Sequence, residues 1–266
     1  GSAMKKYLYI FKSELMSNLQ YIGNTLVGFI GYSIMIFIFL NLWNYIYSDT
    51  SELINGYTKT QMIWYVIITE IIWKCTSGRS FCKKIIDDVK SGNIAYNLNK
   101  PYSYVGYVLS SHLGSSAITA VLYIPLGLIL GGLFLKSIPV LNLLQVIIIL
   151  ISGMLAVVIS SLLIILIGLF SFVIEDANPI FWIHSKIILI LGTLFPVEYF
   201  PAFLQPLIIA SPIFVTCYGP ARLFVNFTWE TCASVLIAQI IYVIAIYLLC
   251  SLIYRKGVKR INVNGG

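Results

Sequence analysis

Long apolar segments separated by short charged stretches constrain this chain more than any other feature of its sequence. A helix needs about 20 apolar residues to cross a hydrocarbon core of about 30 Å. Six segments approach or exceed that length: residues 25–47, 57–75, 104–134, 140–173, 180–195 and 231–254. We therefore expect an all-α membrane protein with six transmembrane helices. The third and fourth segments are longer than a span requires, so they should tilt, kink or protrude, and Pro125 should kink the third.

The composition excludes a water-soluble globular domain. Hydrophobic residues make up 59% of the 266 residues and charged residues only 10%, whereas soluble domains carry about 25% charged residues. The net charge is +7, but the basic residues flank apolar segments and form no stripe with stacking aromatic side chains, so nucleic acid is not an expected partner. We expect the lipid bilayer to surround the chain. Residues 1–3, Gly-Ser-Ala, precede Met4 and resemble an expression scar, which leaves 4–266 as a single transmembrane domain.

The distribution of lysine and arginine predicts which helix ends face the cytosol. If the N-terminus is cytosolic, all but three of the Lys and Arg residues fall in inner segments, and the exceptions are Lys59, Lys136 and Arg222. Basic residues concentrate on the cytosolic side of membrane proteins. We therefore place both termini in the cytosol, as six spans require.

An amphipathic helix should precede the first span. Residues 4–18 place apolar side chains at the spacing of one helical face, and these are Tyr7, Ile10, Phe11 and Leu15. Charged residues interrupt the apolar run too early for a cleavable signal peptide. We therefore expect a helix that lies in the membrane interface.

A second amphipathic helix should lie on the cytosolic side between the second and third spans, before Ser91 and Gly92 end it. Its apolar face consists of Phe81, Ile85, Ile86 and Val89, and its charged face includes Lys83, Lys84, Asp87, Asp88 and Lys90. We expect the apolar face to bind a partner protein while the charged residues set register at the rim. The alternative is a helix on anionic lipid, which the lysines favour and the aspartates oppose.

Residues 196–227 are apolar but cannot form a continuous helix, because five prolines interrupt them: Pro196, Pro201, Pro206, Pro212 and Pro220. Irregular backbone persists at membrane depth only where protein or a water-filled cavity satisfies its polar groups. We expect a re-entrant helical hairpin in the outer leaflet, and the alternative is a loop on the outer surface. Its bulky side chains are candidates for a gate or for interfacial anchors: Tyr199, Phe200, Phe203 and Leu204.

Few ionisable residues fall inside the expected spans. Glu70 and Lys74 are four residues apart in the favourable order for a helical ion pair. We expect them to face the interior or an inner vestibule, either as a structural pair or as part of a pathway or gate. The five cysteines leave open whether Cys217 and Cys232 are bridged.

The sequence contains none of the common catalytic or metal-binding patterns. It has no phosphate-binding loop, no HExxH, no GxSxG and no Cys/His cluster at metal-ligand spacing. We therefore expect no enzyme activity, no cofactor and no metal in this chain. Any ATP that it uses must be hydrolysed by another polypeptide.

Two local sequences resemble those of the type 2 ABC exporter permeases. Residues 91–103, with Gly92 followed by Leu98-Asn-Lys-Pro-Tyr-Ser103, look like that family's entry into the third span. Residues 192–201, followed by Ser211-Pro212 and Tyr218-Gly-Pro220-Ala, resemble its re-entrant region. The order of an amphipathic lead-in, six spans, a cytosolic helix and an outer hairpin is also similar, so the resemblance covers nearly the whole chain.

The resemblance implies a membrane-spanning permease subunit of an ATP-driven exporter in a bacterial plasma membrane. Separate ABC ATPase subunits would bind ATP and Mg and would dock on Phe81–Val89 as the coupling helix. A second permease chain, identical or related, would complete the pathway. That family exports drugs, peptide antibiotics, polysaccharides and lipids. The alternatives are a secondary transporter independent of ATP, which would need paired broken helices, and a membrane scaffold without transport activity.

Overall fold

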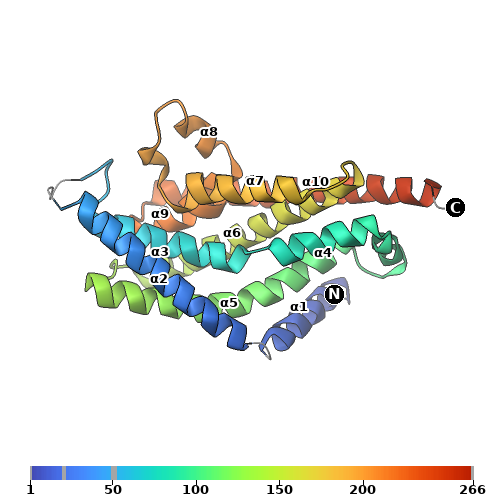
Figure 1. Cartoon of the computed structure of the whole chain (residues 1–266), viewed down its shortest axis with the longest axis horizontal. Coiled ribbons are helices and arrows are strands. Elements are labelled where there is room, and N and C mark those ends of the chain that lie inside the picture. Colours follow the sequence, from blue (N-terminus) through green and yellow to red (C-terminus); the bar gives the residue numbers. More distant parts are fainter. Residues whose placement is uncertain (1, 20–21, 49–52, 265–266) are drawn as a thin grey trace.

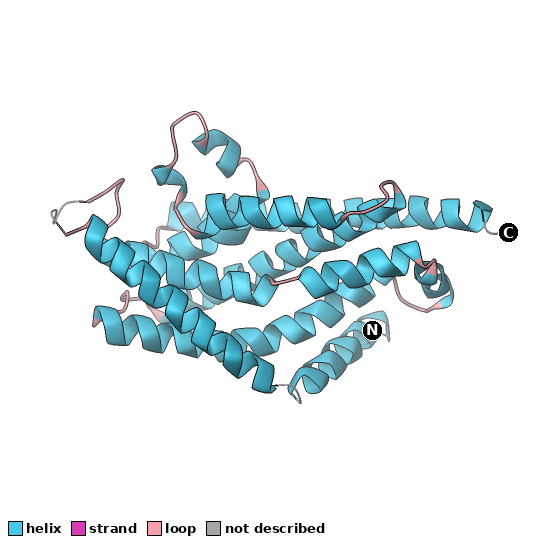
Figure 2. Ribbon diagram, viewed as in Figure 1, coloured by secondary structure: helices cyan, strands magenta, loops and turns pink. Residues whose placement is uncertain are grey.

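The computed structural model describes residues 2–19, 22–48 and 53–264, which are almost entirely helical (Figure 2). Helices account for 83% of the residues, and the described part contains no strand beyond an isolated bridge between Ile54 and Tyr57. The expected all-α class is confirmed. The elements are α1 (Ser2–Leu19), α2 (Ile22–Ile46), α3 (Lys59–Thr76), α4 (Arg79–Lys90), η1 (Asn93–Asn99), α5 (Tyr104–Leu135), α6 (Leu143–Leu169), η2 (Phe170–Phe172), α7 (Asn178–Ile188), η3 (Leu189–Thr193), η4 (Val197–Tyr199), α8 (Gln205–Ile209), η5 (Phe214–Tyr218), α9 (Gly219–Val225) and α10 (Trp229–Asn264).

The long helices form an elongated bundle (Figure 1). α1 packs against α5, α10 packs against α6, and α5 packs against both α3 and α6. The N-terminal end of α1, the C-terminal end of α10 and α4 lie toward the same end of the bundle (Figure 1). The C-terminal end of α2 and the start of α3 lie toward the opposite end. The polar segments expected on the cytosolic side therefore gather at one end.

Helix α3 is the most enclosed of the long helices. It begins with a capping box, in which the Thr58 hydroxyl accepts from the Gln61 N–H and the Gln61 side chain accepts from the Thr58 N–H. α2, α5 and α9 pack around it, and Trp64 and Tyr65 are fully buried. Because protein rather than lipid surrounds most of α3, this helix can carry polar side chains that a lipid-facing helix could not.

Two glycines let α5 approach α3 closely. A Cβ atom at Gly127 would lie 2.7 Å from Ile71 Cδ1, and one at Gly131 would overlap the Trp64 ring. Small residues allow this kind of approach between membrane helices. α5 remains helical through Pro125 from Tyr104 to Leu135.

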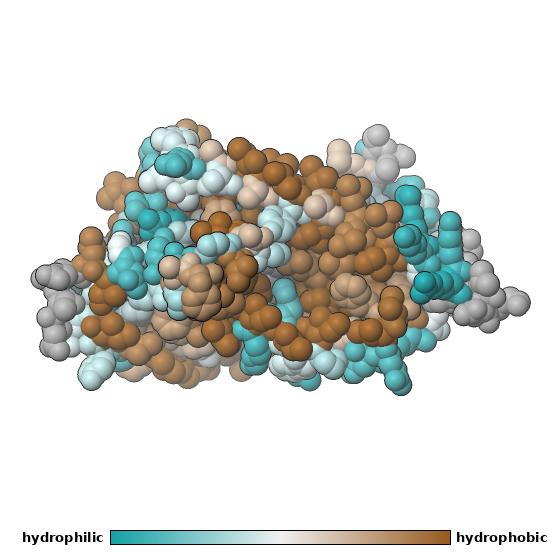
Figure 3. Space-filling view, turned by 90° about the horizontal axis from the view of Figure 1, so that it is seen from above, coloured by the Kyte–Doolittle hydropathy of each residue, from teal (hydrophilic) through white to brown (hydrophobic). Residues whose placement is uncertain are grey.

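Within the part of the chain that the structure describes, four helices are long and apolar enough to cross a membrane, and they cover residues 27–46, 104–135, 143–172 and 229–260. They correspond to the first, third, fourth and sixth expected spans. The second expected span forms α3, which has only 18 residues and carries Lys59, Glu70 and Lys74. The fifth forms α7, of 11 residues, and the π-helical turn η3. Apolar side chains cover much of the middle of the face in Figure 3, and hydrophilic ones gather at its right-hand end and over part of its left half.

Buried polar side chains tie the apolar helices together. Gln239 of α10 donates to the carbonyl oxygens of Ser152 in α6 and Val215 in η5, both at 2.9 Å. Such bonds satisfy backbone groups that α6 and η5 would otherwise expose to an apolar interior. All five cysteines are free and buried, so Cys217 and Cys232 are not bridged.

Candidate functional site

Helix α4 begins and ends where its sequence contains glycine. It starts after Gly78, where a Cβ atom would overlap the Ile164 side chain. At its other end the Ser91 N–H donates to the Asp87 carbonyl at 2.9 Å, and Gly92 adopts a left-handed conformation with φ 74°. Glycine takes this conformation without steric cost. These two breaks separate α4 from α3 and η1.

The apolar face of α4 is occupied within the chain. Cys82, Ile85, Ile86 and Val89 are at most 5% exposed, and they pack mainly on α6. A Cβ atom at Gly168 of α6 would lie only 2.6 Å from Ile85 Cγ2. The expectation that this face meets a partner protein is therefore corrected. The apolar surface of α4 is already buried, because α4 follows α3 closely in the chain and packs along the neighbouring helix α6.

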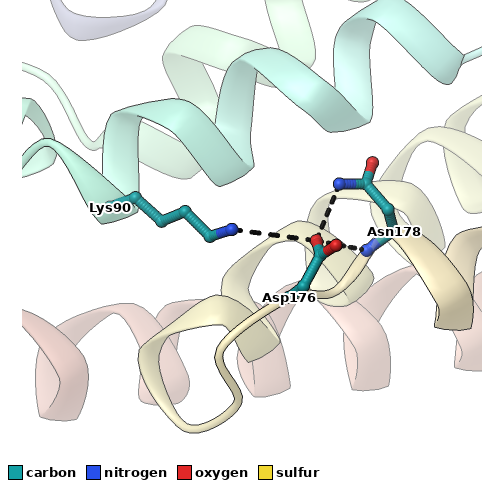
Figure 4. Close-up of polar contacts among 3 residues, drawn as sticks. All are labelled: Lys90, Asp176 and Asn178. Carbon is teal, nitrogen blue, oxygen red and sulfur yellow. Dashed lines mark hydrogen bonds and ion pairs between the residues drawn. The ribbon is translucent and has the colours of Figure 1, made fainter.

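Polar contacts hold α4 at its C-terminal end. The Tyr104 hydroxyl donates to Asp88 Oδ2 at 2.8 Å. Lys90 Nζ lies 3.8 Å from Asp176 Oδ1, in the loop before α7 (Figure 4). The Asn178 backbone and side-chain N–H groups donate to the same oxygen and hold the pKa of Asp176 below its usual value. The Lys90–Asp176 pair is half-exposed and adds little stability.

The face of α4 that remains free is charged. Arg79, Lys83, Lys84 and Asp87 are exposed. Phe81, the remaining apolar residue of the expected docking face, is only partly buried and stacks on a histidine ring of α5 with the ring centroids 4.2 Å apart. A partner protein could therefore contact α4 mainly through its lysines and Asp87.

Glu70 and Lys74 line one hollow of about 330 Å³ between α2, α3 and Leu189. Glu70 is only 2% exposed, and its Oε1 atom has no hydrogen-bond partner among the described residues. Lys74 is half-buried. The two side chains do not form the expected ion pair, since the one ion pair within the described ranges joins Lys90 to Asp176. The Glu70 side chain is almost fully covered, whereas Lys74 is partly exposed.

The proline-rich segment 196–227 folds into the short elements η4, α8, η5 and α9. Side chains of α3 satisfy part of the irregular backbone beside it. The Tyr65 hydroxyl donates to the Gly192 carbonyl and the Thr69 hydroxyl to the Thr193 carbonyl, both at 2.8 Å. Irregular backbone in an apolar environment needs hydrogen-bond partners from the protein, and these two hydroxyls supply them for two carbonyl groups.

The four candidate gate residues do not share one environment. The Tyr199 hydroxyl lies 3.1 Å from that of Tyr47 at the end of α2. Phe200 and Leu204 are half-buried beside Val197 and Ile208, in a small cluster of their own segment. Phe203 is 77% exposed. Tyr199 therefore joins the segment to the rest of the chain, and Phe203 faces the surroundings.

A cluster of polar side chains around Glu198 was not predicted from the sequence. Glu198 Oε1 accepts from the Tyr218 hydroxyl at 2.6 Å and Oε2 from the Tyr57 hydroxyl at 3.0 Å. The Arg222 guanidinium lies 4.8 Å from the centre of the Tyr57 ring. These side chains connect η4, η5 and α9 to the start of α3. The available signal was that Glu198 is the sole carboxylate in residues 196–227, and a charge in such a segment needs partners.

A comparison with known protein families agrees with these features. The family described as "ABC-2 family transporter protein" matches residues 18–265. The chain belongs to the ABC-2 transporter family. The matched range includes α4, the hollow beside Glu70 and the whole proline-rich segment of this ABC-2 protein. No curated protein matches the chain.

Proposed function

We propose that this ABC-2 protein is the membrane-spanning permease subunit of an ATP-driven exporter. The family match over residues 18–265 carries the proposal. Because the sequence has no phosphate-binding loop, separate ATPase subunits would bind ATP and Mg and drive transport. A second permease chain, identical or related, would complete the pathway.

The proposed topology has six spans, with α3 and the continuous helix α7–η3 added to the four long apolar helices. The 18 residues of α3 reach about 27 Å at 1.5 Å per residue, and neighbouring helices shield its polar groups. Both termini and α4 lie toward one end of the bundle (Figure 1). This arrangement supports the cytosolic placement of both termini in a bacterial plasma membrane, which the lysine and arginine distribution favours.

In this proposal α4 is the coupling helix, and the ATPase contacts its charged face. The buried residues Ile85 and Ile86 hold the helix on α6, so movement of α4 would pass directly to a long membrane helix. Lys83, Lys84 and Asp87 would set register and partner choice. The proline-rich segment would form the outer closure of the pathway, re-entering the outer leaflet, and the Glu198 cluster would hold it on α3.

Co-purification tests the assignment. Tagged protein extracted from its native membranes in mild detergent should carry ATP hydrolysis, and mass spectrometry should identify a subunit with a phosphate-binding loop. Lys83→Glu together with Lys84→Glu should release that subunit, because it reverses the charge of the exposed face of α4. Lys59→Glu, exposed at the other end of the bundle, is the matched control and should retain it.

Two results would overturn this proposal. One is transport by the purified chain in liposomes with no ATPase present. The other is full retention of the ATPase by the variant with both charge reversals. That result would overturn the coupling role of the charged face of α4, and the family assignment would stand.

A further inference from the structure

A small pocket lies where the end of α3 and the start of α4 meet α6 and α7. Its volume is about 190 Å³, and its lining contains the cations Arg79 and Lys186 and, among the described residues, no carboxylate. Both cations are exposed. Neither forms an ion pair, since the one ion pair within the described ranges joins Lys90 to Asp176. The described residues therefore leave two positive charges without a counter-charge at one pocket.

The donors around the pocket suit an anion with several acceptor oxygens. The Arg79 guanidinium lies 4.8 Å from the centre of the Trp182 ring, and this contact holds it at the edge of the pocket, where Trp182 is 44% exposed. Arginine can donate two parallel N–H bonds to one phosphate group. Ser160 and Ser185 also line the pocket and offer hydroxyl donors. α4 begins here without a side-chain cap, and the uncapped N–H groups of a helix start add to the attraction for an anion.

Lys186 lies within an apolar stripe of α7, and this stripe indicates what carries the anion. Ile183 and Ile187 are 61% and 44% exposed, and their spacing places them with Lys186 on one helical face. In the proposed topology this face meets lipid, where a charged side chain is costly unless an opposite charge lies beside it. The pocket can hold a phosphate group but is too small for an acyl chain, whereas the stripe outside it suits one. A ligand with both parts is a phospholipid.

We propose that this pocket binds the phosphate group of an anionic phospholipid, whose acyl chains lie along the apolar stripe of α7. Arg79 and Lys186 supply the positive charge, and because they belong to α4 and α7, one lipid bridges the two helices. A zwitterionic phospholipid binds less well, since its headgroup brings a cation of its own next to theirs. The inference rests on the proposed function only in placing α7 in the membrane. Binding itself requires neither ATP nor a partner subunit.

Equilibrium binding of two phospholipids with the same acyl chains tests this inference. The tagged full chain in detergent micelles, without any ATPase, is titrated with radiolabelled dioleoylphosphatidylglycerol and dioleoylphosphatidylcholine in a scintillation proximity assay. We expect saturable binding of phosphatidylglycerol, about twentyfold tighter than that of phosphatidylcholine, because two basic residues face the headgroup. Arg79→Gln and Lys186→Gln should each weaken phosphatidylglycerol binding about fivefold, and the variant with both changes should lose the preference. Lys256→Gln, an exposed cation of α10 outside the pocket, is the matched control and should keep it.

A steric variant and a competitor separate the pocket from general attraction to a basic surface. Ser185→Leu fills part of the pocket without changing either cation, so it should also weaken phosphatidylglycerol binding. Excess inorganic phosphate at matched ionic strength should not displace the lipid, because it has no acyl chain to place on α7. Equal affinity for the two lipids, equal effects of Arg79→Gln and Lys256→Gln, or displacement by free phosphate would overturn the proposal. Because no ATPase is present, these results are independent of the coupling experiment above.

Discussion

Docking of α4 on α6 can be disturbed by adding one carbon atom. A Cβ atom at Gly168 would lie 2.6 Å from Ile85 Cγ2 and 2.8 Å from Ile85 Cβ. Both contacts are too short, and Ile85 is fully buried, so Gly168→Ala must push α4 away from α6. Overpacking of a buried contact costs about 1–3 kcal/mol. We therefore expect the undocked population of α4 to rise about 5- to 150-fold, since each 1.4 kcal/mol is a factor of ten.

The native Cys82 reports this undocking without any added probe. It lies on the same face of α4 and is 1% exposed, so a maleimide reaches it only when α4 opens. Its labelling rate, followed by mass spectrometry of the Cys82 peptide, should rise by the same factor when opening and closing are fast relative to labelling. Gly153→Ala is the control. Gly153 lies in α6, as Gly168 does, and a Cβ atom there meets nothing within 4 Å.

The outcome separates α4 packing from general stability. Gly153→Ala should leave the labelling rate of Cys82 within about twofold and slightly stabilise α6, since alanine is about 1 kcal/mol better than glycine in a helix. Equal Cys82 labelling in Gly168→Ala and the unmodified chain would refute the packing of α4 on α6. It would also restore Ile85 as a candidate contact for the partner.

Two further substitutions test the polar contacts outside α6. Glu198→Gln should lower the thermal midpoint of the purified protein, because it weakens charge-assisted bonds from Tyr57 and Tyr218 worth about 1.5–3 kcal/mol each; an unchanged midpoint would count against the cluster as an anchor. Asp176→Asn should destabilise the protein at neutral pH and not in acid. The pKa of Asp176 lies below its usual 3.8 through bonds from Asn178, so its contribution is present above 3.8 and is lost as the pH falls through the folded-state pKa; a difference that persists in acid would contradict this.

Hydropathy and charge predicted much of the fold because they act locally. α5 (Tyr104–Leu135) and α6 (Leu143–Leu169) match the expected spans 104–134 and 140–173 within a few residues at each end. Polar residues at the membrane surface mark these boundaries in the sequence. α10 extends past the expected end at 254 to Asn264. Nothing in local composition stops a polar helix from continuing beyond the membrane.

The candidate sites were harder to predict because they depend on neighbours distant in sequence. The amphipathic pattern correctly placed a helix at α4, but a pattern does not specify whether an apolar face meets a partner or, as Ile85 does, the chain's own α6. The spacing of Glu70 and Lys74 indicated an ion pair, yet the fold buries Glu70, leaves Lys74 partly exposed and brings the two into no ion pair among the described residues. Glu198 accepts hydrogen bonds from two tyrosines, of which Tyr57 is 141 positions away in the sequence and Tyr218 is 20 positions away.

Reconstitution with the ATPase identified by co-purification tests the central claim most directly. ATP hydrolysis is measured in liposomes that contain the ATPase alone, the ATPase with this chain, and the ATPase with the Lys83→Glu, Lys84→Glu variant. The proposed coupling predicts hydrolysis several-fold faster with the unmodified chain than with the ATPase alone, and little stimulation by the variant. Identical rates with and without the unmodified chain would contradict its role as the permease of an ATP-driven transporter.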